Sequence, residues 1–161
     1  MRAVHSGRTR FIGNGLKNVL LKRPETERTK LERTRKLMDA NLPGAVVVGY
    51  ESLIPNLVLP DENDRHVLAA AIQGEANLIV TFNLSDFPAG VLGSHGVEAV
   101  HPDDFVLALL DSDAEPVLNA VSLHRANLKK TPKSPEQYLG KMESDGLKKT
   151  AARLRSLIDQ I

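Results

Sequence analysis

Two short apolar runs separated by a helical segment constrain the fold more than any other feature of this sequence. Ala45–Gly49 contains three consecutive valines, and Leu78–Thr81 is a second apolar, β-branched run. Both are typical of strands buried on both faces of a sheet. Between them, Asp61–Glu75 places apolar side chains at helical spacing and is predicted to be a helix. Strands that alternate with helices in this way predict a parallel α/β sheet.

The rest of the chain extends this pattern and ends in helices. A third strand is predicted at Val97–Val100, after one helical turn at Pro88–Leu92. Further helices are predicted at Pro102–Leu110, Glu115–Lys129, Pro135–Ser144 and Leu147–Ile161. The expected fold is therefore α/β, a parallel sheet flanked by helices in three layers (α/β/α), with a helical C-terminal extension. We expect the α/β domain to span residues 1–112 and the extension, packed on it, to span residues 113–161.

The residues before Ala45 show a weaker pattern. Leu16–Lys22 predicts a short helix and Glu25–Asn41 a stronger one. No periodicity holds in Met1–Asn14, so we expect no strand before Leu16 and an α/β domain that is incomplete at its N-terminus. A sheet that lacks a strand leaves backbone edges that invite pairing, which predicts a homo-oligomer.

Composition narrows the class of protein. The chain of 161 residues has no cysteine, which excludes a disulfide framework and a Cys-based zinc site and fits a reducing cytoplasm. No apolar stretch approaches the length of a membrane span, and no signal-peptide pattern opens the chain, so no membrane partner is expected. Aromatic residues make up only 4%, which argues against a stacking platform for single-stranded nucleic acid.

The net charge of +1 conceals an uneven distribution. Arg2–Arg35 is basic, Glu51–Asp113 is acidic, and the chain turns basic again from Arg125. Basic segments on both sides of an acidic centre are suited to attract a polyanion to a metal-holding site. Solvated helix faces explain the same charges and are the commoner case.

Four polar residues are predicted to meet at one edge of the sheet. Asp61 and Asp64 begin the predicted helix, and Asn83 and Asp86 follow the strand Leu78–Thr81. In a right-handed crossover the helix runs antiparallel to the strands, so its N-terminus lies at the carboxyl end of the next strand. Open α/β sheets build their sites at this edge. Carboxylates gathered there repel one another unless a cation neutralises them, and oxygen ligands favour Mg²⁺ or Mn²⁺.

A second interpretation of these residues needs no metal. Asp61 and Asp64 have the spacing of an N-cap with its capping-box partner, and the helix macrodipole favours acids at that end. Asn83 and Asp86 are also common turn residues. Judged by spacing alone, caps and turns are the more frequent explanation.

Two segments resemble a known family. The run LPDENDRHVLAAA at residues 59–71, followed by LIVTFNLSDFP at residues 78–88, closely resembles PIN-domain proteins, which include the toxin nucleases of bacterial toxin–antitoxin pairs. The resemblance implies that Asp64 and Asp86 are catalytic, metal-binding acids and that Asn83 and Asp61 are further metal ligands. It also implies Mg²⁺ or Mn²⁺ as cofactor, RNA as substrate and an antitoxin protein as partner.

The chain departs from the family at its N-terminus. PIN domains usually open with a hydrophobic strand that ends in Asp, followed by a helix that carries a Glu, whereas Phe11–Asn18 contains no acid and Asp39 is the one Asp before Asp61. Two expected carboxylates are therefore missing, as in a shortened or degenerate relative. We expect a metal-dependent ribonuclease with impaired activity. The alternatives are a catalytically silent PIN-like module that binds a protein or RNA, and a structural interaction protein whose acids are only caps.

Overall fold

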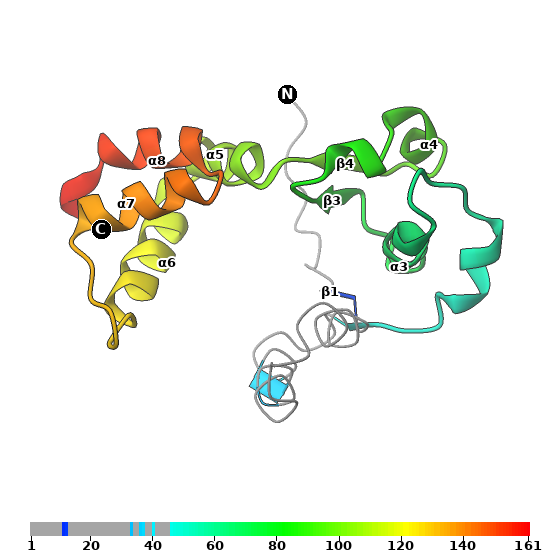
Figure 1. Cartoon of the computed structure of the whole chain (residues 1–161), viewed down its shortest axis with the longest axis horizontal. Helices are drawn as coiled ribbons and strands as arrows, with labels where there is room; N and C mark the ends of the chain where they lie inside the picture. The colour runs from blue at the N-terminus through cyan, green and yellow to red at the C-terminus, as the bar shows by residue number, and fades with distance from the viewer. Residues whose placement is uncertain (1–10, 13–32, 34–35, 38–39, 41–45) are drawn as a thin grey trace. The chain divides into compact units, whose positions relative to one another are not determined.

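The computed structural model describes residues 11–12, 33, 36–37, 40 and 46–161 (Figure 1). The chain forms two compact units. The first comprises the described residues up to Ile79 together with Ser85–Ala99, and the second comprises Val80–Leu84 and Val100–Ile161. The predicted helix Leu16–Lys22 lies outside the described residues, as does nearly all of the predicted helix Glu25–Asn41.

The strands predicted in the middle of the chain are present in shorter form. They are β2 (Val46–Val47), β3 (Leu78–Val80) and β4 (Glu98–Val100). A further strand, β1 (Phe11–Ile12), pairs in parallel with β2. The expectation of no strand before Leu16 is therefore wrong. A strand of two residues is too short to show alternation in the sequence, and it is defined only by its pairing with a distant segment.

The strand β3 pairs with β4. The Glu98 N–H donates to the Asn77 carbonyl, and the Thr81 N–H donates to the Val100 carbonyl, both at 3.0 Å. Because the paired residue numbers rise together along both strands, this ladder is parallel. Among the described residues the strands thus form two two-stranded parallel sheets, β1–β2 and β3–β4. The α/β class with a parallel sheet and a helical C-terminus is confirmed.

The strands β2 and β3 are buried on one face only, so the expectation that these two runs are buried on both faces is wrong. Val47 and Ile79 are each 7% exposed and belong to the hydrophobic core of the first unit. Their neighbours Val48 and Val80 are 73% and 44% exposed. Successive side chains of a strand point to opposite faces, so in these short sheets one face packs into the core and the other does not.

The predicted helix Asp61–Glu75 forms in two parts. A 3₁₀ turn at Glu62–Asp64 leads directly into the α-helix α3 (Arg65–Gln73). Leu68 and Ala69–Ala71 of α3 are buried in the first core. The core also includes Phe87, just before the short helix α4 (Ala89–Gly93), and Leu92 within that helix. The apolar face of α3 thus anchors the turn that carries Asp61 and Asp64.

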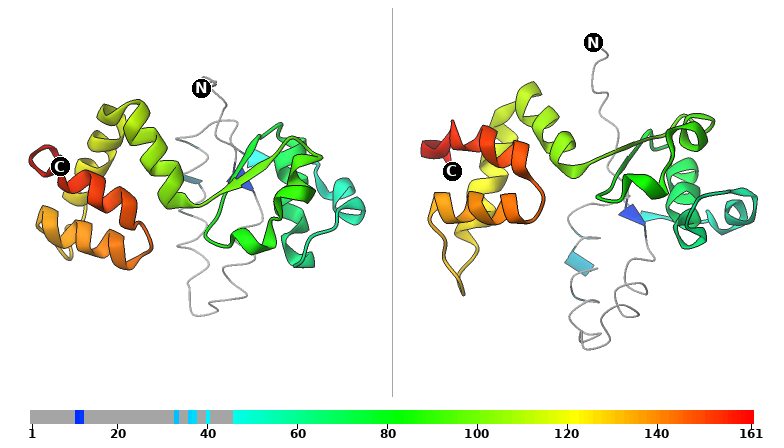
Figure 2. Two further views of the ribbon diagram at one scale, coloured as in Figure 1. Left: turned by 90° about the horizontal axis from the view of Figure 1, so that it is seen from above. Right: turned by 45° about the horizontal axis from the view of Figure 1, so that its top comes forward.

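The second unit is helical. It contains α5 (Pro102–Ser112), α6 (Ala114–Ala126), α7 (Pro135–Ser144) and α8 (Lys148–Arg155). A 3₁₀ turn at Ile158–Gln160 follows α8. Both views in Figure 2 show α7 and α8 side by side. Eight buried side chains form the core between these helices: Leu110, Leu118, Val121, Tyr138, Leu139, Ala151, Leu154 and Ile161. The helices predicted over this part of the chain are present, with ends that differ by a few residues.

One buried aspartate joins two of these helices. Asp103, at the start of α5, is only 4% exposed and accepts hydrogen bonds from the N–H groups of Lys149 and Thr150, both at 2.8 Å. It therefore caps the first turn of α8, where the N-cap position, Leu147, offers no side-chain cap. Burial opposes ionisation of Asp103, but these donors and the positive charge of Lys149 hold its pKa below the ordinary value.

Replacing Asp103 with Asn should destabilise the protein strongly. The amide would keep one acceptor but turn a donor toward the N–H groups of α8, at a cost of about 2 kcal/mol in the free energy of unfolding at neutral pH. Because the folded-state pKa of Asp103 is lowered, its contribution is present above the ordinary carboxyl pKa and is lost as the pH falls through the folded value. The difference in the free energy of unfolding between wild type and Asp103→Asn, measured by urea denaturation, should therefore become smaller as the pH is lowered.

The neighbouring residue provides the control. The exposed Asp104 forms an ion pair with the Lys149 ammonium, so Asp104→Asn should cost less than about 1 kcal/mol in the free energy of unfolding. Equal losses of stability in the two variants would contradict the assigned role of Asp103.

Candidate metal centre

The turn before α3 carries two of the predicted site residues in different roles. The Asp61 carboxylate accepts hydrogen bonds from the backbone N–H and the side-chain amide of Asn63, at 2.8 and 2.9 Å. Asp61 is thus the N-cap of the 3₁₀ turn. Asp64 occupies the N-cap position of α3, but its side chain makes no cap hydrogen bond. The capping interpretation therefore holds for Asp61 and fails for Asp64.

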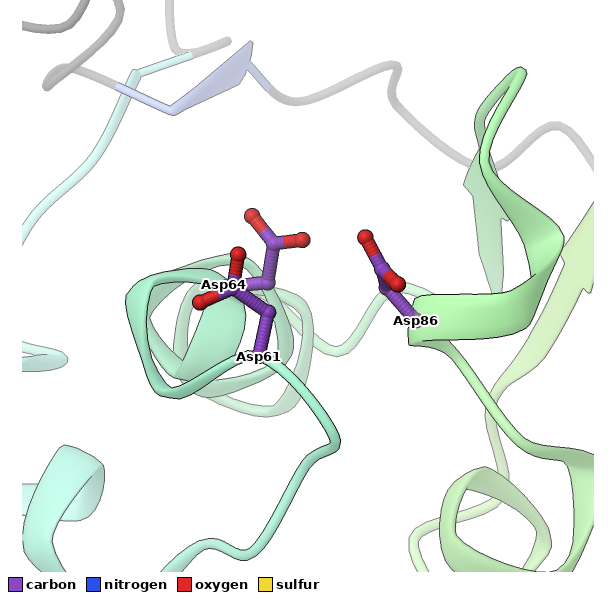
Figure 3. A group of neighbouring side chains, drawn as sticks. All are labelled: Asp61, Asp64 and Asp86. Atoms are coloured by element: carbon purple, nitrogen blue, oxygen red, sulfur yellow. The ribbon is translucent and has the colours of Figure 1, made fainter.

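Asp86 completes the group from another part of the chain. It ends a 3₁₀ turn at Leu84–Asp86, shortly after β3, and the next residue, Phe87, is buried in the first core. One carboxylate oxygen from each of Asp61, Asp64 and Asp86 lies within 4.8 Å of the others. Figure 3 shows Asp61 and Asp64 projecting from the turn at the start of α3 and Asp86 approaching from the opposite side. The structure thus brings together three of the four residues that the sequence selected.

The pKa of Asp64 reports this crowding. Burial raises the pKa of Asp64 most, and the negative charges of Asp61 and Asp86 raise it further. A hydrogen bond with Asp86 also favours the protonated form, while His66 acts in the opposite direction. A carboxyl group whose neighbours are carboxylates gains most from a cation that replaces the shared proton.

The donor set fits a small, hard divalent cation. Carboxylate oxygens are the ligands that Mg²⁺ and Mn²⁺ prefer. Two ligands about 2.1 Å from one ion lie at most about 4.2 Å apart, close to the spacing of this group. Small side-chain rotations would bring the three carboxylates onto one ion. Asp61, Asp64 and Asp86 would each offer one carboxylate oxygen, and Asp61 is held in place by its hydrogen bonds from Asn63.

The fourth predicted residue lies in the other unit. The exposed Asn83 belongs to the segment Val80–Leu84, where its backbone N–H donates to the Thr81 hydroxyl at 3.1 Å. Its role as a metal ligand stays a prediction. No further His or acidic residue from the described parts of the chain joins the group of three.

One neighbour of the site was not singled out by sequence. Arg65 forms an ion pair with Glu62 at 2.7 Å, beside Asp64. Its i,i+3 spacing on the same turn is the signal that predicts such a pair. The pair places a positive charge at the start of α3.

Comparison with known proteins relates the chain to a named ribonuclease and to one protein family. The family model described as VapC50 C-terminal domain matches residues 102–156. The chain is 46% identical over 70 residues to Putative ribonuclease VapC50 of Mycobacterium tuberculosis, a match that covers 44% of this chain and 41% of that protein. The match thus spans about two fifths of the length of the curated relative. No solved structure matches the chain.

Together, the matched C-terminal domain and the similar protein support a VapC-type member of the PIN-domain family. Both findings agree with the family resemblance of the two acidic segments. In the described part of the chain, none of the helices has the length and apolar character needed to cross a membrane.

Removing the charge of Asp64 should stabilise the metal-free protein. At neutral pH the folded state holds three carboxylates together, and Asp64→Asn relieves two repulsions while preserving shape. We expect a gain of a few tenths to about 1 kcal/mol in the free energy of unfolding, measured by urea denaturation with EDTA present. The control is Glu62→Gln, since Glu62 belongs to the same turn, is exposed and pairs with Arg65. Glu62→Gln should not raise the free energy of unfolding. A clear loss of stability in Asp64→Asn would show that the proposed repulsion is absent.

Proposed function

We propose that this chain is a metal-dependent ribonuclease of the VapC type that holds Mg²⁺ or Mn²⁺ between Asp61, Asp64 and Asp86. One observation carries the proposal. Asp64 stands at the start of a helix yet does not cap it, and its carboxylate lies instead within 4.8 Å of two others. Three gathered carboxylates are unfavourable in a purely structural role, whereas they are the common way to hold a hard cation. The similar mycobacterial protein is itself named as a ribonuclease.

Each residue of the group has a distinct part in the proposed chemistry. A bound divalent cation supplies an activated water and offsets the charge that develops on a phosphate during hydrolysis. Asp64 and Asp86, whose carboxylates come from different segments of the chain, would hold the cation between them. Asp61 is held by its two hydrogen bonds from Asn63 and contributes a third oxygen. Asn83 follows β3 and is proposed as a neutral oxygen ligand.

The proposed activity is weak. The two further carboxylates that the family resemblance leads us to expect have no counterpart in the residues before Asp61. A site with fewer ligand charges binds its cation less tightly. Catalysis by a metal also depends on fixed coordination geometry, which three ligands define less well than five.

The resemblance and the VapC50 match also support a partner protein. We propose that an antitoxin of the cognate type binds this chain and that RNA is its substrate. The division at residue 112 and the homo-oligomer remain predictions. The second candidate function is a catalytically silent module that binds RNA or a protein, and the missing carboxylates are the observation that favours it.

Metal-dependent cleavage of RNA tests the proposal. Purified protein should cleave a mixed RNA pool slowly with Mn²⁺ or Mg²⁺ and not at all in EDTA. Asp64→Asn and Asp86→Asn should each lower the rate at least about tenfold, since each removes a proposed ligand of the cation. The change from Asp to Asn at position 104 serves as a control for charge, because Asp104 pairs with Lys149 in the other unit and its loss should leave the rate unchanged.

Asp64→Asn separates stability from activity, since it should fold at least as well as wild type and yet cleave more slowly. Cleavage that persists at the wild-type rate in this variant would remove Asp64 from the site. RNA binding with no cleavage at any metal concentration would favour the silent module.

A further inference from the structure

The segment that connects α6 to α7 is basic in sequence and contains no acidic residue. From Pro116 to Pro135 the chain contains no Asp or Glu but four cationic residues: Arg125, Lys129, Lys130 and Lys133. Three of them lie in the loop of residues 127–134 that joins the two helices. We call Lys129, Lys130 and Lys133 the lysine loop.

Most other cations of the second unit are neutralised. Lys141 pairs with Asp145, Lys149 with Asp104, Arg153 with Asp111, and Arg155 with Glu136 and Glu143. In contrast, the lysine loop has no ion pair to any residue that the structure describes. Uncompensated positive charge on this unit is therefore concentrated in one short segment.

The loop is held in place from inside. Leu128 packs against the core of the second unit, and a capping box between Ser134 and Gln137 fixes the start of α7. The Arg125 guanidinium donates to the Lys133 carbonyl at 3.2 Å and to a backbone oxygen of Ile161 at 3.3 Å. Arg125 thus secures the loop, while Lys129 and Lys130 are exposed and Lys133 is half-buried. The three ammonium groups are presented on an anchored segment.

We infer that the lysine loop binds the phosphate backbone of RNA. Ammonium groups on flexible stems suit phosphate oxygens as point charges and carry no base preference. The loop has three lysines and no aromatic residue, whereas protein interfaces are depleted in Lys and enriched in aromatic side chains. An RNA strand is therefore the better fit than an acidic protein. The choice of RNA rests on the proposed function, but the residues of the lysine loop are not those of the proposed metal site.

Binding of RNA by the full chain tests this inference without requiring cleavage. The probe is a fluorescein-labelled single-stranded RNA of mixed sequence, followed by fluorescence anisotropy at several salt concentrations with EDTA present. The test variant combines Lys129→Gln, Lys130→Gln and Lys133→Gln. The matched control combines Lys141→Gln, Lys148→Gln and Lys149→Gln, which removes the same charge from exposed lysines of the same unit.

The lysine-loop variant should bind RNA on the order of 10- to 100-fold more weakly at about 0.1 M salt. The slope of log affinity against log salt should fall by about 2, because each lost phosphate contact removes about 0.7. The control variant should change the affinity less than about threefold. Circular dichroism checks that both variants are folded.

Three results would overturn the inference: no RNA binding by wild type, equal weakening in both variants, or an unchanged salt slope. Competition by poly-L-glutamate as strong as that by unlabelled RNA would also overturn it, in favour of an acidic protein partner. Since EDTA removes any divalent cation, a failure of RNA cleavage has no bearing on these outcomes, and loss of RNA binding leaves the metal site untouched.

Discussion

Repulsion between three carboxylates is the constraint around which the first unit is built. Asp61, Asp64 and Asp86 come from two segments that the chain brings within 4.8 Å of each other. What holds them there is apolar: Leu68 of α3 is fully buried, and Phe87, next to Asp86, is 6% exposed in the same core. Burial of such side chains contributes roughly 1.5 to 3 kcal/mol each, more than partly exposed charges lose by repulsion. The core thus keeps the site assembled in the absence of a cation.

Two aspartates show how the surroundings of one side chain decide its role. Asp103 is buried among backbone N–H donors, and its pKa is lowered even though burial opposes ionisation. Asp64 is half-buried, and burial raises its pKa most, with a further rise from the neighbouring carboxylates of Asp61 and Asp86. The charge of Asp103 is satisfied within the protein and stabilises the junction of α5 and α8. Asp64 instead faces the carboxylates of Asp61 and Asp86, the arrangement on which the proposed metal site rests.

Much of this arrangement follows from local sequence. The helices of the second unit could be predicted because their signals are local, as with Pro102 in the first turn of α5 and the Ser134–Gln137 capping box of α7. The approach of Asp64 to Asp86 could also be predicted, since a crossover helix has a fixed polarity relative to the strands that flank it. A helix start and a strand end therefore locate the three aspartates without knowledge of the side-chain packing.

The features that escaped prediction depend on distant partners. The strand β1 is defined only by its pairing with β2, and the exposed faces of β2 and β3 depend on which segments pack on each sheet. Asp103 caps α8 through hydrogen bonds to Lys149 and Thr150, which lie 46 and 47 positions further along the chain. The same limit applies to Asp61 and Asp64: their spacing is that of a capping box, and only the structure shows that Asp64 is not used as a cap.

Calorimetric titration of the intact chain with Mn²⁺ at neutral pH tests the central claim most directly, because it measures the cation itself rather than its effect on RNA. The account predicts one weak site per chain that Asp64→Asn and Asp86→Asn each abolish, while a protein with Asn at position 104 binds Mn²⁺ as wild type does. Identical titration curves for wild type and Asp64→Asn would contradict it and leave the three aspartates without a metal.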